Sequence, residues 1–258
     1  MIRALRRQGL RLVLGLGMGL VAGAAPAWAQ APQAGAKPDF SGIWQVERRF
    51  SLATGAGREG MAHTVGSPLP LLPWNAALHE GYKNASRAGV PWTPNNQRCL
   101  VAGTVRAMKG NFPWRWLQTD EQVSVLFEED GRVNIFPFQS AHRADTKLTW
   151  HGDGIASWDG DTLVIDVSHF NGKTPFPHAV FHTTQLKVQH RFKLLDGGKR
   201  LEDRMRIEDP GAFTRPFEAL SVFARQSDDY KMIDYRCAEN NRDLPEPLQW
   251  WSPDWGPE

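Results

Sequence analysis

The segment from His182 to Asp209 constrains the fold most strongly, because polar and apolar residues alternate along it on both sides of a glycine turn. Alternation with a period of two is typical of a strand that buries one face. From Leu186 to Leu194 the even positions are mostly apolar, and after Asp196-Gly197-Gly198-Lys199 the apolar positions become odd. We therefore predict a β-hairpin that turns at the two glycines.

This turn also fixes which residues face each other. A two-residue turn sets His190 opposite Met205 and places Asp203 diagonally from His190, within side-chain reach. A His-Asp pair on an apolar face can act as general base and orienting group, because the carboxylate fixes the histidine tautomer. A buried pair whose two members only satisfy each other is the alternative. The strand is expected to start at His182, which would put His182 and Thr184 on the same face.

Further turn and strand patterns extend this hairpin into a larger sheet. Asp130-Gly131 is expected to set Glu129 opposite Arg132 and Val125 opposite Phe136, and a second turn is expected at Asp159-Gly160. The remaining elements are predicted strands over residues 39–46, 217–224 and 230–236, and a helix over 75–88 with Asn75 as its N-cap. Regularly spaced hairpins with one short helix predict a mainly β fold, an antiparallel meander that closes into a lipocalin-like barrel.

The N-terminal residues 1–29 have the pattern of a signal peptide. Arginines precede an apolar run from Leu12 to Ala25, and Ala27-Trp28-Ala29 forms a cleavage site. The run is shorter than the roughly 20 residues that a membrane span needs. General secretion fits better than twin-arginine export because Gly9 follows the arginine pair where an apolar residue is expected. We expect a periplasmic or secreted protein with a flexible leader over 30–38 and one domain over 39–258.

Cysteine content and charge narrow the expected chemistry. Cys99 and Cys237 are the only cysteines, and an even pair in an exported protein predicts a disulfide. The formal net charge of +2 turns slightly negative without the signal arginines, so nothing indicates nucleic-acid binding. No nucleophile-elbow serine motif and no phosphate-binding glycine loop is present, and no cofactor is expected.

No metal site is expected either. His178 and His182 have the spacing of a helical metal pair, but Pro175 and Pro177 argue against a helix there. Several aspartates surround the second turn, yet the distal glutamate of a calcium-binding EF-type loop is missing. These aspartates are Asp153, Asp159, Asp161 and Asp166.

Aromatic residues are the expected ligand contacts. Trp44 follows Gly42 in the first strand, and this Gly-x-Trp start resembles that of lipocalin-type barrels, in which the tryptophan plugs the closed end. A tail with Trp250, Trp251 and Trp255 is expected to dock on the barrel or cover its mouth, and residues 51–73 are expected to form a long surface loop. The predicted ligand-binding residues are Thr184, Phe192, Met205, Trp44 and Trp158.

The second hairpin carries a resemblance to a family. Trp158-Asp159-Gly160-Asp161-Thr162-Leu163-Val164-Ile165-Asp166 resembles a recurrent signature of exported bacterial proteins of uncharacterised function. Blocks such as Phe181-His182-Thr183-Thr184 and Tyr235-Arg236-Cys237-Ala238-Glu239 look like later parts of the same family. The resemblance covers most of the mature chain and implies export, but it implies no activity.

Three functions follow from these patterns. The first is an exported, monomeric or weakly associating β-barrel that binds a small apolar or aromatic molecule inside. The second is a cofactor-free acid/base enzyme, an isomerase, lyase or hydrolase, that uses His190 with Asp203 and His182 as catalytic residues. The third is an interaction module of the cell envelope, which the loop over residues 51–73 suggests.

Overall fold

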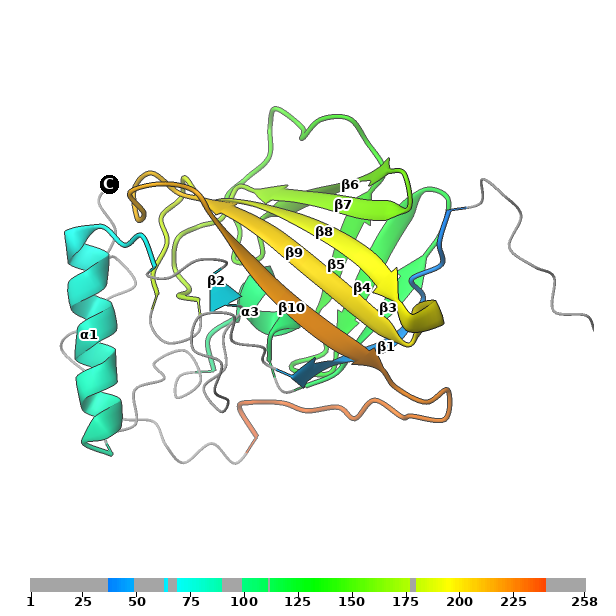
Figure 1. Cartoon of the computed structure of the whole chain (residues 1–258), viewed down its shortest axis with the longest axis horizontal. Coiled ribbons are helices and arrows are strands. Elements are labelled where there is room, and N and C mark those ends of the chain that lie inside the picture. Colours follow the sequence, from blue (N-terminus) through cyan, green and yellow to red (C-terminus); the bar gives the residue numbers. More distant parts are fainter. Residues whose placement is uncertain are drawn as a thin grey trace, which may run out of the picture. The chain divides into compact units, whose positions relative to one another are not determined.

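The computed structural model describes residues 37–48, 63–64, 69–89, 99–110, 112–176 and 180–239. The predicted signal peptide, most of the leader, much of the loop over 51–73, His178 and the Trp250-Trp251-Trp255 tail lie outside these residues. The described chain is mainly β, as predicted, and consists of one curled antiparallel sheet with helices beside it (Figure 1). None of the helices among these residues is long and apolar enough to cross a membrane.

Among the described residues, the sheet follows one path of strands in the order β5-β4-β3-β1-β10-β9-β8-β7-β6, and β2 pairs with β10. β1 lies between β3 and β10, so that the two ends of the strand sequence are paired. The strands are β1 Gly42–Arg48, β2 His63–Thr64, β3 Trp114–Gln118, β4 Gln122–Phe127, β5 Val133–Pro137, β6 Asp153–Asp159, β7 Thr162–Ser168, β8 Lys187–Leu195, β9 Arg200–Glu208 and β10 Phe217–Arg225.

The two edge strands, β5 and β6, approach each other without forming a ladder. Strand direction alternates along an antiparallel path, so the first and last of nine strands must point the same way. The contact between them is an isolated parallel bridge from Phe138 to Ala156. The approach is close, because a Cβ added to Gly154 in β6 would lie 2.3 Å from the Phe136 ring of β5. Closure into a barrel is therefore not shown, and we call this boundary the seam.

The β8–β9 hairpin has the predicted register. His190 faces Met205, Phe192 faces Asp203 and Leu194 faces Leu201. The connection contains four residues rather than two, since the ladder ends at the pair Leu195 and Arg200 and a short 3₁₀ turn, η2, covers Asp196–Gly198. Gly197 and Gly198 both have positive φ angles of 65° and 87°, which glycine adopts without steric cost. The predicted pairs are still formed because the four-residue loop over 196–199 is centred on the same two glycines as the predicted two-residue turn.

The start of β8 was predicted wrongly. The strand begins at Lys187, while Thr184 and Gln185 form a turn. The Asp209 carboxylate accepts hydrogen bonds from the Thr183 backbone N–H and hydroxyl, which holds Thr183 away from a strand ladder. As a result Thr184 is exposed rather than on the inner face.

The other two hairpins differ from the predicted registers by small shifts. Val125 faces Asn134, and Phe136 faces Val123. The β4–β5 register thus slides by two residues, an even shift that keeps every side chain on its predicted face. The slide occurs because Phe127 N–H bonds to Arg132 O, leaving a loop longer than the predicted turn. In β6–β7, Asp159 pairs with Thr162, so the turn lies one residue later than predicted.

The C-terminal described segment packs on this β4–β5 loop instead of forming a strand over 230–236. Only Tyr235 makes a bridge, to Glu129. The Glu128 carboxylate accepts hydrogen bonds from the Tyr230 hydroxyl at 3.2 Å and the Ile233 N–H at 3.1 Å. A side-chain acceptor thus takes the place of a strand partner, which explains why the alternation there was misleading.

The helix α1, Pro73–Arg87, confirms the predicted helix within two residues at its start. Asn75 is not its N-cap, because Pro73 already occupies the first turn, where a missing N–H costs nothing. Asn75 is instead fully buried and joins α1 to two other segments. Its amide donates to Phe181 O at 2.8 Å and to Ala212 O at 3.3 Å, and it accepts from Phe181 N–H.

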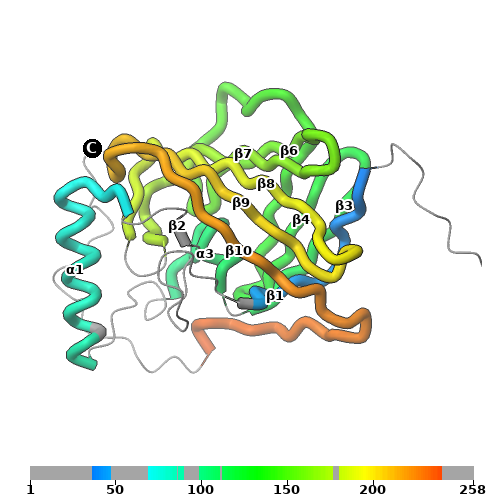
Figure 2. The backbone as a smooth tube through the Cα atoms, viewed as in Figure 1, coloured from blue at the N-terminus to red at the C-terminus, as the bar shows by residue number. Residues whose placement is uncertain are grey.

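A second helix, α3 (Thr104–Met108), was not predicted and lies on the inner side of β9 and β10 (Figure 2). Val105, Ala107 and Met108 are buried in the same core as the sheet's inner residues. The core is dominated by large aromatic side chains, which pack across the curled sheet. Its largest fully buried side chains include Trp44, Trp114, Trp116, Phe40, Phe170, Phe192 and Phe223.

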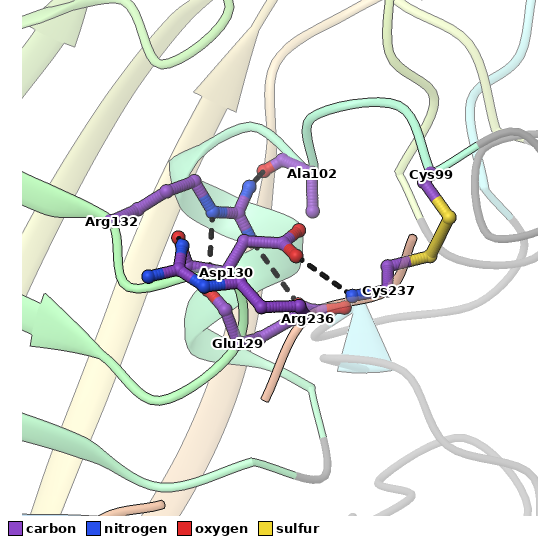
Figure 3. Close-up of polar contacts among 7 residues, drawn as sticks. All are labelled: Cys99, Ala102, Glu129, Asp130, Arg132, Arg236 and Cys237. Atoms are coloured by element: carbon purple, nitrogen blue, oxygen red, sulfur yellow. Dashed lines mark hydrogen bonds and ion pairs between the residues drawn. A yellow bond between two sulfur atoms is a disulfide. The ribbon is translucent and has the colours of Figure 1, made fainter. Parts of the chain in front are cut away.

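Cys99 and Cys237 form the predicted disulfide, with Cα atoms 5.4 Å apart. Figure 3 shows how the β4–β5 loop supports it. The Asp130 side chain accepts a hydrogen bond from Cys237 N–H at 3.0 Å, and Arg132 donates to Ala102 O at 3.4 Å. The loop therefore holds the segments on both sides of the disulfide.

Removing this disulfide should destabilise the fold substantially. The cysteines are 138 residues apart, and on the chain-entropy view a loop of that length contributes about 4 to 5 kcal/mol. We expect Cys99→Ser combined with Cys237→Ser to lower the free energy of unfolding in urea by about this amount. Dithiothreitol should destabilise the wild type and leave the double variant unchanged. Equal sensitivity of both proteins to the reductant would contradict this.

Candidate functional site

The predicted His190–Asp203 pair is present and is part of a larger buried group. His190 Nδ1 lies 3.0 and 3.2 Å from the two Asp203 carboxylate oxygens. Lys109, just after α3, donates to Asp203 Oδ2 at 2.8 Å. Relative exposure is 1% for the His190 side chain, 0% for Asp203 and 4% for Lys109. Adjacent strands supply the first two residues, and α3 brings in the third.

Burial and charge act against each other in this group. Burial alone would raise the pKa of Asp203, but the nearby Lys109 and His190 favour the carboxylate and bring its pKa below the usual value. For Lys109, burial lowers the pKa, and the attraction of Asp203 opposes this only in part. The Lys109 ammonium also lies over the Phe223 ring, 4.9 Å from its centre. The three groups hold one another in otherwise apolar surroundings.

Within the part of the chain that the structure describes, two polar atoms near this group lack a hydrogen-bond partner: His190 Nε2 and Trp116 Nε1. Phe192 contacts both rings, since it stacks on His190 with centroids 5.4 Å apart and meets Trp116 edge-on at 4.8 Å. Such atoms normally find a partner when buried, and leaving one without costs about 1 to 3 kcal/mol. His190 Nε2 and Trp116 Nε1 could therefore each form one more hydrogen bond, next to the Phe192 ring.

A pocket of about 540 Å³ opens at the seam. Phe138 and Trp158 stack in its wall with ring centres 5.9 Å apart, and the Lys37 ammonium lies 5.4 Å from the centre of the Trp158 ring. The volume is in the usual range for small-molecule sites. Its lining consists of Lys37, Gln118, Thr119, Asp120, Phe138, Gln139, Ser140, Ala156, Ser157 and Trp158. We call this space the seam pocket.

Aromatic contacts connect the seam pocket with the interior. The buried Phe40 ring lies 5.9 Å from Trp158 and 5.8 Å from Trp116. Trp116 in turn meets Phe192, which stacks on His190. A row of ring contacts therefore runs from the pocket to the buried His190–Asp203 pair.

The structure does not bring all predicted site residues to this place. His182 is buried between the Phe170 and Phe176 rings, and burial lowers its pKa. Trp44 is fully buried and satisfied, because its indole N–H donates to Phe40 O. Thr184 is exposed. Phe192 and Met205 lie beside His190, and Trp158 lines the seam pocket.

The acidic residues around the β6–β7 turn do not converge. Asp159 and Asp161 form ion pairs with Arg191 and Lys193, and Asp166 accepts a hydrogen bond from Gln189. Within the described residues, one group could hold a metal ion by the proximity of its ligand atoms: His142, Asp153 and His169. Asp153 is one of the aspartates considered above as calcium ligands, but no sequence pattern indicated that it lies beside His142 and His169.

Lys109 and the seam pocket were missed by sequence reasoning for different reasons. Lys109 stands in an apolar stretch next to a five-residue helix that has no clear pattern of its own. A lysine among apolar residues is nevertheless a weak signal for a buried charge. The pocket is lined by residues from β3, from the end of β5 and from β6. These segments are far apart in the sequence, so no local sequence pattern predicts that they lie together.

Comparison of the chain with protein-family models and with curated protein sequences finds no significant match. The resemblance to exported bacterial proteins thus stays a prediction.

The buried charge group can be tested through stability. Asp203→Asn leaves the Lys109 ammonium buried without its carboxylate, which should lower the free energy of unfolding by about 3 to 5 kcal/mol. Glu202→Gln changes the neighbouring, partly exposed carboxylate of β9 and should cost less than about 1 kcal/mol. Urea unfolding of both variants measures the difference. Similar values for the two would show that the buried group contributes little.

A pH prediction follows from His151, which precedes β6. Burial, reinforced by the charge of Arg132, lowers its pKa to about 4. In the unfolded chain His151 binds a proton near pH 6.5, whereas in the folded chain it does so only near pH 4. Its contribution to stability is therefore fully present above about pH 6.5. As the pH falls from about 6.5 to 4, the free energy of unfolding decreases by up to ~3 kcal/mol.

His151→Gln removes the titrating group. The difference in unfolding free energy between pH 7 and pH 4.5 should therefore be smaller in His151→Gln than in the wild type. Comparing the two proteins cancels the contribution of the shared carboxylates. Parallel pH curves for the two proteins would contradict the assignment.

Proposed function

We propose that the protein binds a small aromatic or apolar molecule in the seam pocket. The observation that carries this proposal is the stacked pair Phe138 and Trp158 in the wall of a space of about 540 Å³. Half-buried aromatic faces beside open volume are the usual contact surface for a flat apolar ligand. Trp158 is also the predicted ligand residue that lies in this pocket.

The polar part of the lining suggests a substituent on the ring. Lys37 donates to Gly160 O at 3.0 Å and presents its positive charge above Trp158. Amide and hydroxyl groups from Gln118, Gln139 and Ser157 surround the aromatic pair. An aromatic ring with a carboxylate, sulfonate or hydroxyl group fits this combination best.

A second function, the cofactor-free acid/base enzyme, is favoured by one specific observation. His190 Nδ1 is held by Asp203 while Nε2 has no partner, as a general base would require. Packed rings from Trp158 through Phe40 and Trp116 fill the space between the seam pocket and His190. Phe40 and Phe192 would have to shift for a substrate group to arrive, because both are fully buried.

Export to an oxidising compartment is part of the proposal. The Cys99–Cys237 disulfide supports it, since structural disulfides form and persist mainly outside the cytosol. The third expectation, an envelope interaction module, depends on the loop over 51–73, most of which lies outside the described residues.

Binding can be measured with 8-anilinonaphthalene-1-sulfonate, an aromatic anion whose fluorescence rises in apolar surroundings. Trp158→Ala should weaken its affinity by about tenfold or more, because aromatic stacking typically contributes about 1 to 3 kcal/mol. Leu117→Ala, an exposed residue beside Gln118, is the matched control and should bind as the wild type does.

The same proteins separate the two functions. A binder should retain affinity in His190→Ala and lose it in Trp158→Ala, whereas an enzyme should lose turnover in His190→Ala while binding persists. Unchanged affinity in Trp158→Ala, or no binding of the probe to the folded wild type, would reject the seam pocket as the site.

A further inference from the structure

Three potential metal ligands meet at the end of the β6–β7 hairpin that is opposite its turn. Asp153 is the first residue of β6, and His169 directly follows β7. Asp153 pairs across the ladder with Ser168, which places His169 beside it. His142 comes from the connection between β5 and β6. One ligand atom from each of the three lies within 4.8 Å of the other two.

The contacts within this cluster are specific. His142 Nδ1 lies 2.6 Å from Asp153 Oδ2, and the two imidazole rings are 5.5 Å apart. All three residues are partly exposed, so that an ion could reach them from solvent. A simple histidine–carboxylate pair would account for His142 and Asp153. It would not account for the approach of His169.

The backbone holds His169 in an uncommon conformation. Its φ angle is 59°, in the left-handed region that few non-glycine residues occupy, although asparagine, aspartate and histidine adopt it more often than the others. His169 O accepts a hydrogen bond from Thr149 N–H at 2.9 Å, and Asn171 N–H donates to Thr149 O at 2.8 Å. These bonds fix the position from which the imidazole reaches the other two ligands.

We propose that His142, Asp153 and His169 bind a divalent transition-metal ion of the zinc class. Two imidazoles and one carboxylate form a donor set that suits zinc and its neighbours, whereas magnesium and calcium prefer oxygen ligands. With bonds of about 2.0 to 2.1 Å, tetrahedral ligand atoms are roughly 3.4 Å apart, so only small side-chain movements are needed.

A neighbouring hydrogen bond orients one of the ligands. Ser168 Oγ and His169 Nδ1 are hydrogen-bonded at 2.8 Å; with Nδ1–H as the donor, Nε2 of His169 would be the nitrogen that coordinates the metal. Metal-bound histidines almost always use their second nitrogen in this way, and the partner raises the basicity of the ligand. Ser168 is therefore a positioning residue of the proposed site.

A pocket adjoins the proposed site on the side of His142. His142 and Ser168 both line this pocket of about 350 Å³, whose other walls include Lys187, Arg206 and Glu208. A site with three protein ligands and space for a fourth, exchangeable ligand is typical of metal centres that bind a water or a small molecule. This inference is independent of the seam pocket.

Equilibrium titration of the metal-free mature protein with Zn²⁺ tests the proposal. We expect one Zn²⁺ per chain and no competition by Mg²⁺. His142→Ala, Asp153→Asn and His169→Asn should each weaken binding by more than about 100-fold, because loss of a ligand's hydrogen-bond partner alone costs about 10- to 100-fold. Ser168→Ala should fall within that smaller range. Asparagine is chosen at 169 because it tolerates the positive φ angle.

Asp145→Asn is the matched control, since Asp145 is an exposed carboxylate of the same connection that pairs with Arg143. It should bind Zn²⁺ as the wild type does. Co²⁺ provides a second measurement, because its visible absorption reports the ligand geometry and should disappear in His169→Asn. Circular dichroism checks that each variant is folded. Zn²⁺ binding that persists in the three ligand variants, or no binding by the wild type, would overturn the proposal.

Discussion

Strand direction is the constraint on which the arrangement of this protein depends. Nine strands that alternate in direction leave two edges pointing the same way, and an antiparallel ladder cannot join them. In the described chain the edges β5 and β6 form no ladder; they share the isolated Phe138–Ala156 bridge, and Gly154 of β6 lies against the Phe136 ring of β5. An antiparallel hairpin can connect through two residues, but parallel strands need a longer crossover. The chain between Phe138 and Asp153 provides that connection.

Both proposed sites lie along this boundary. The seam pocket uses Phe138 at the end of β5 and Trp158 in β6, and the proposed metal ligands use His142 in the connection and Asp153 at the start of β6. Residues of irregular connections are free of ladder and core requirements, so they can carry polar chemistry next to a rigid scaffold. The place where the sheet fails to close is therefore also where its functional groups can gather.

The interior contains a buried group of charged and polar side chains. Lys109, Asp203 and His190 are charged or polar groups within a core of aromatic rings, and such groups are retained only when they pair with one another. Their pairing joins α3 to the β8–β9 hairpin. Among the residues that the structure describes, His190 Nε2 and the nearby Trp116 Nε1 have no hydrogen-bond partner.

Sequence alone determined the features that depend on local periodicity. Alternation from Leu186 to Ile207, with two glycines between, determined the β8–β9 register and thereby the contact of His190 with Asp203. The helix near Asn75 and the pairing of two isolated cysteines were accessible for similar reasons, since each rests on a few residues with strong preferences. The predicted strand over 230–236 was wrong because the Glu128 side chain outcompeted a strand partner there.

Only the tertiary structure decided where separate segments meet. It put Lys109 against Asp203, Phe138 against Trp158, and His142 beside Asp153 and His169. It also left the sheet open, because the number of strands and their directions are global properties of the chain. Local alternation specifies which face of a strand is buried, but it carries no information on which distant strand will be its neighbour.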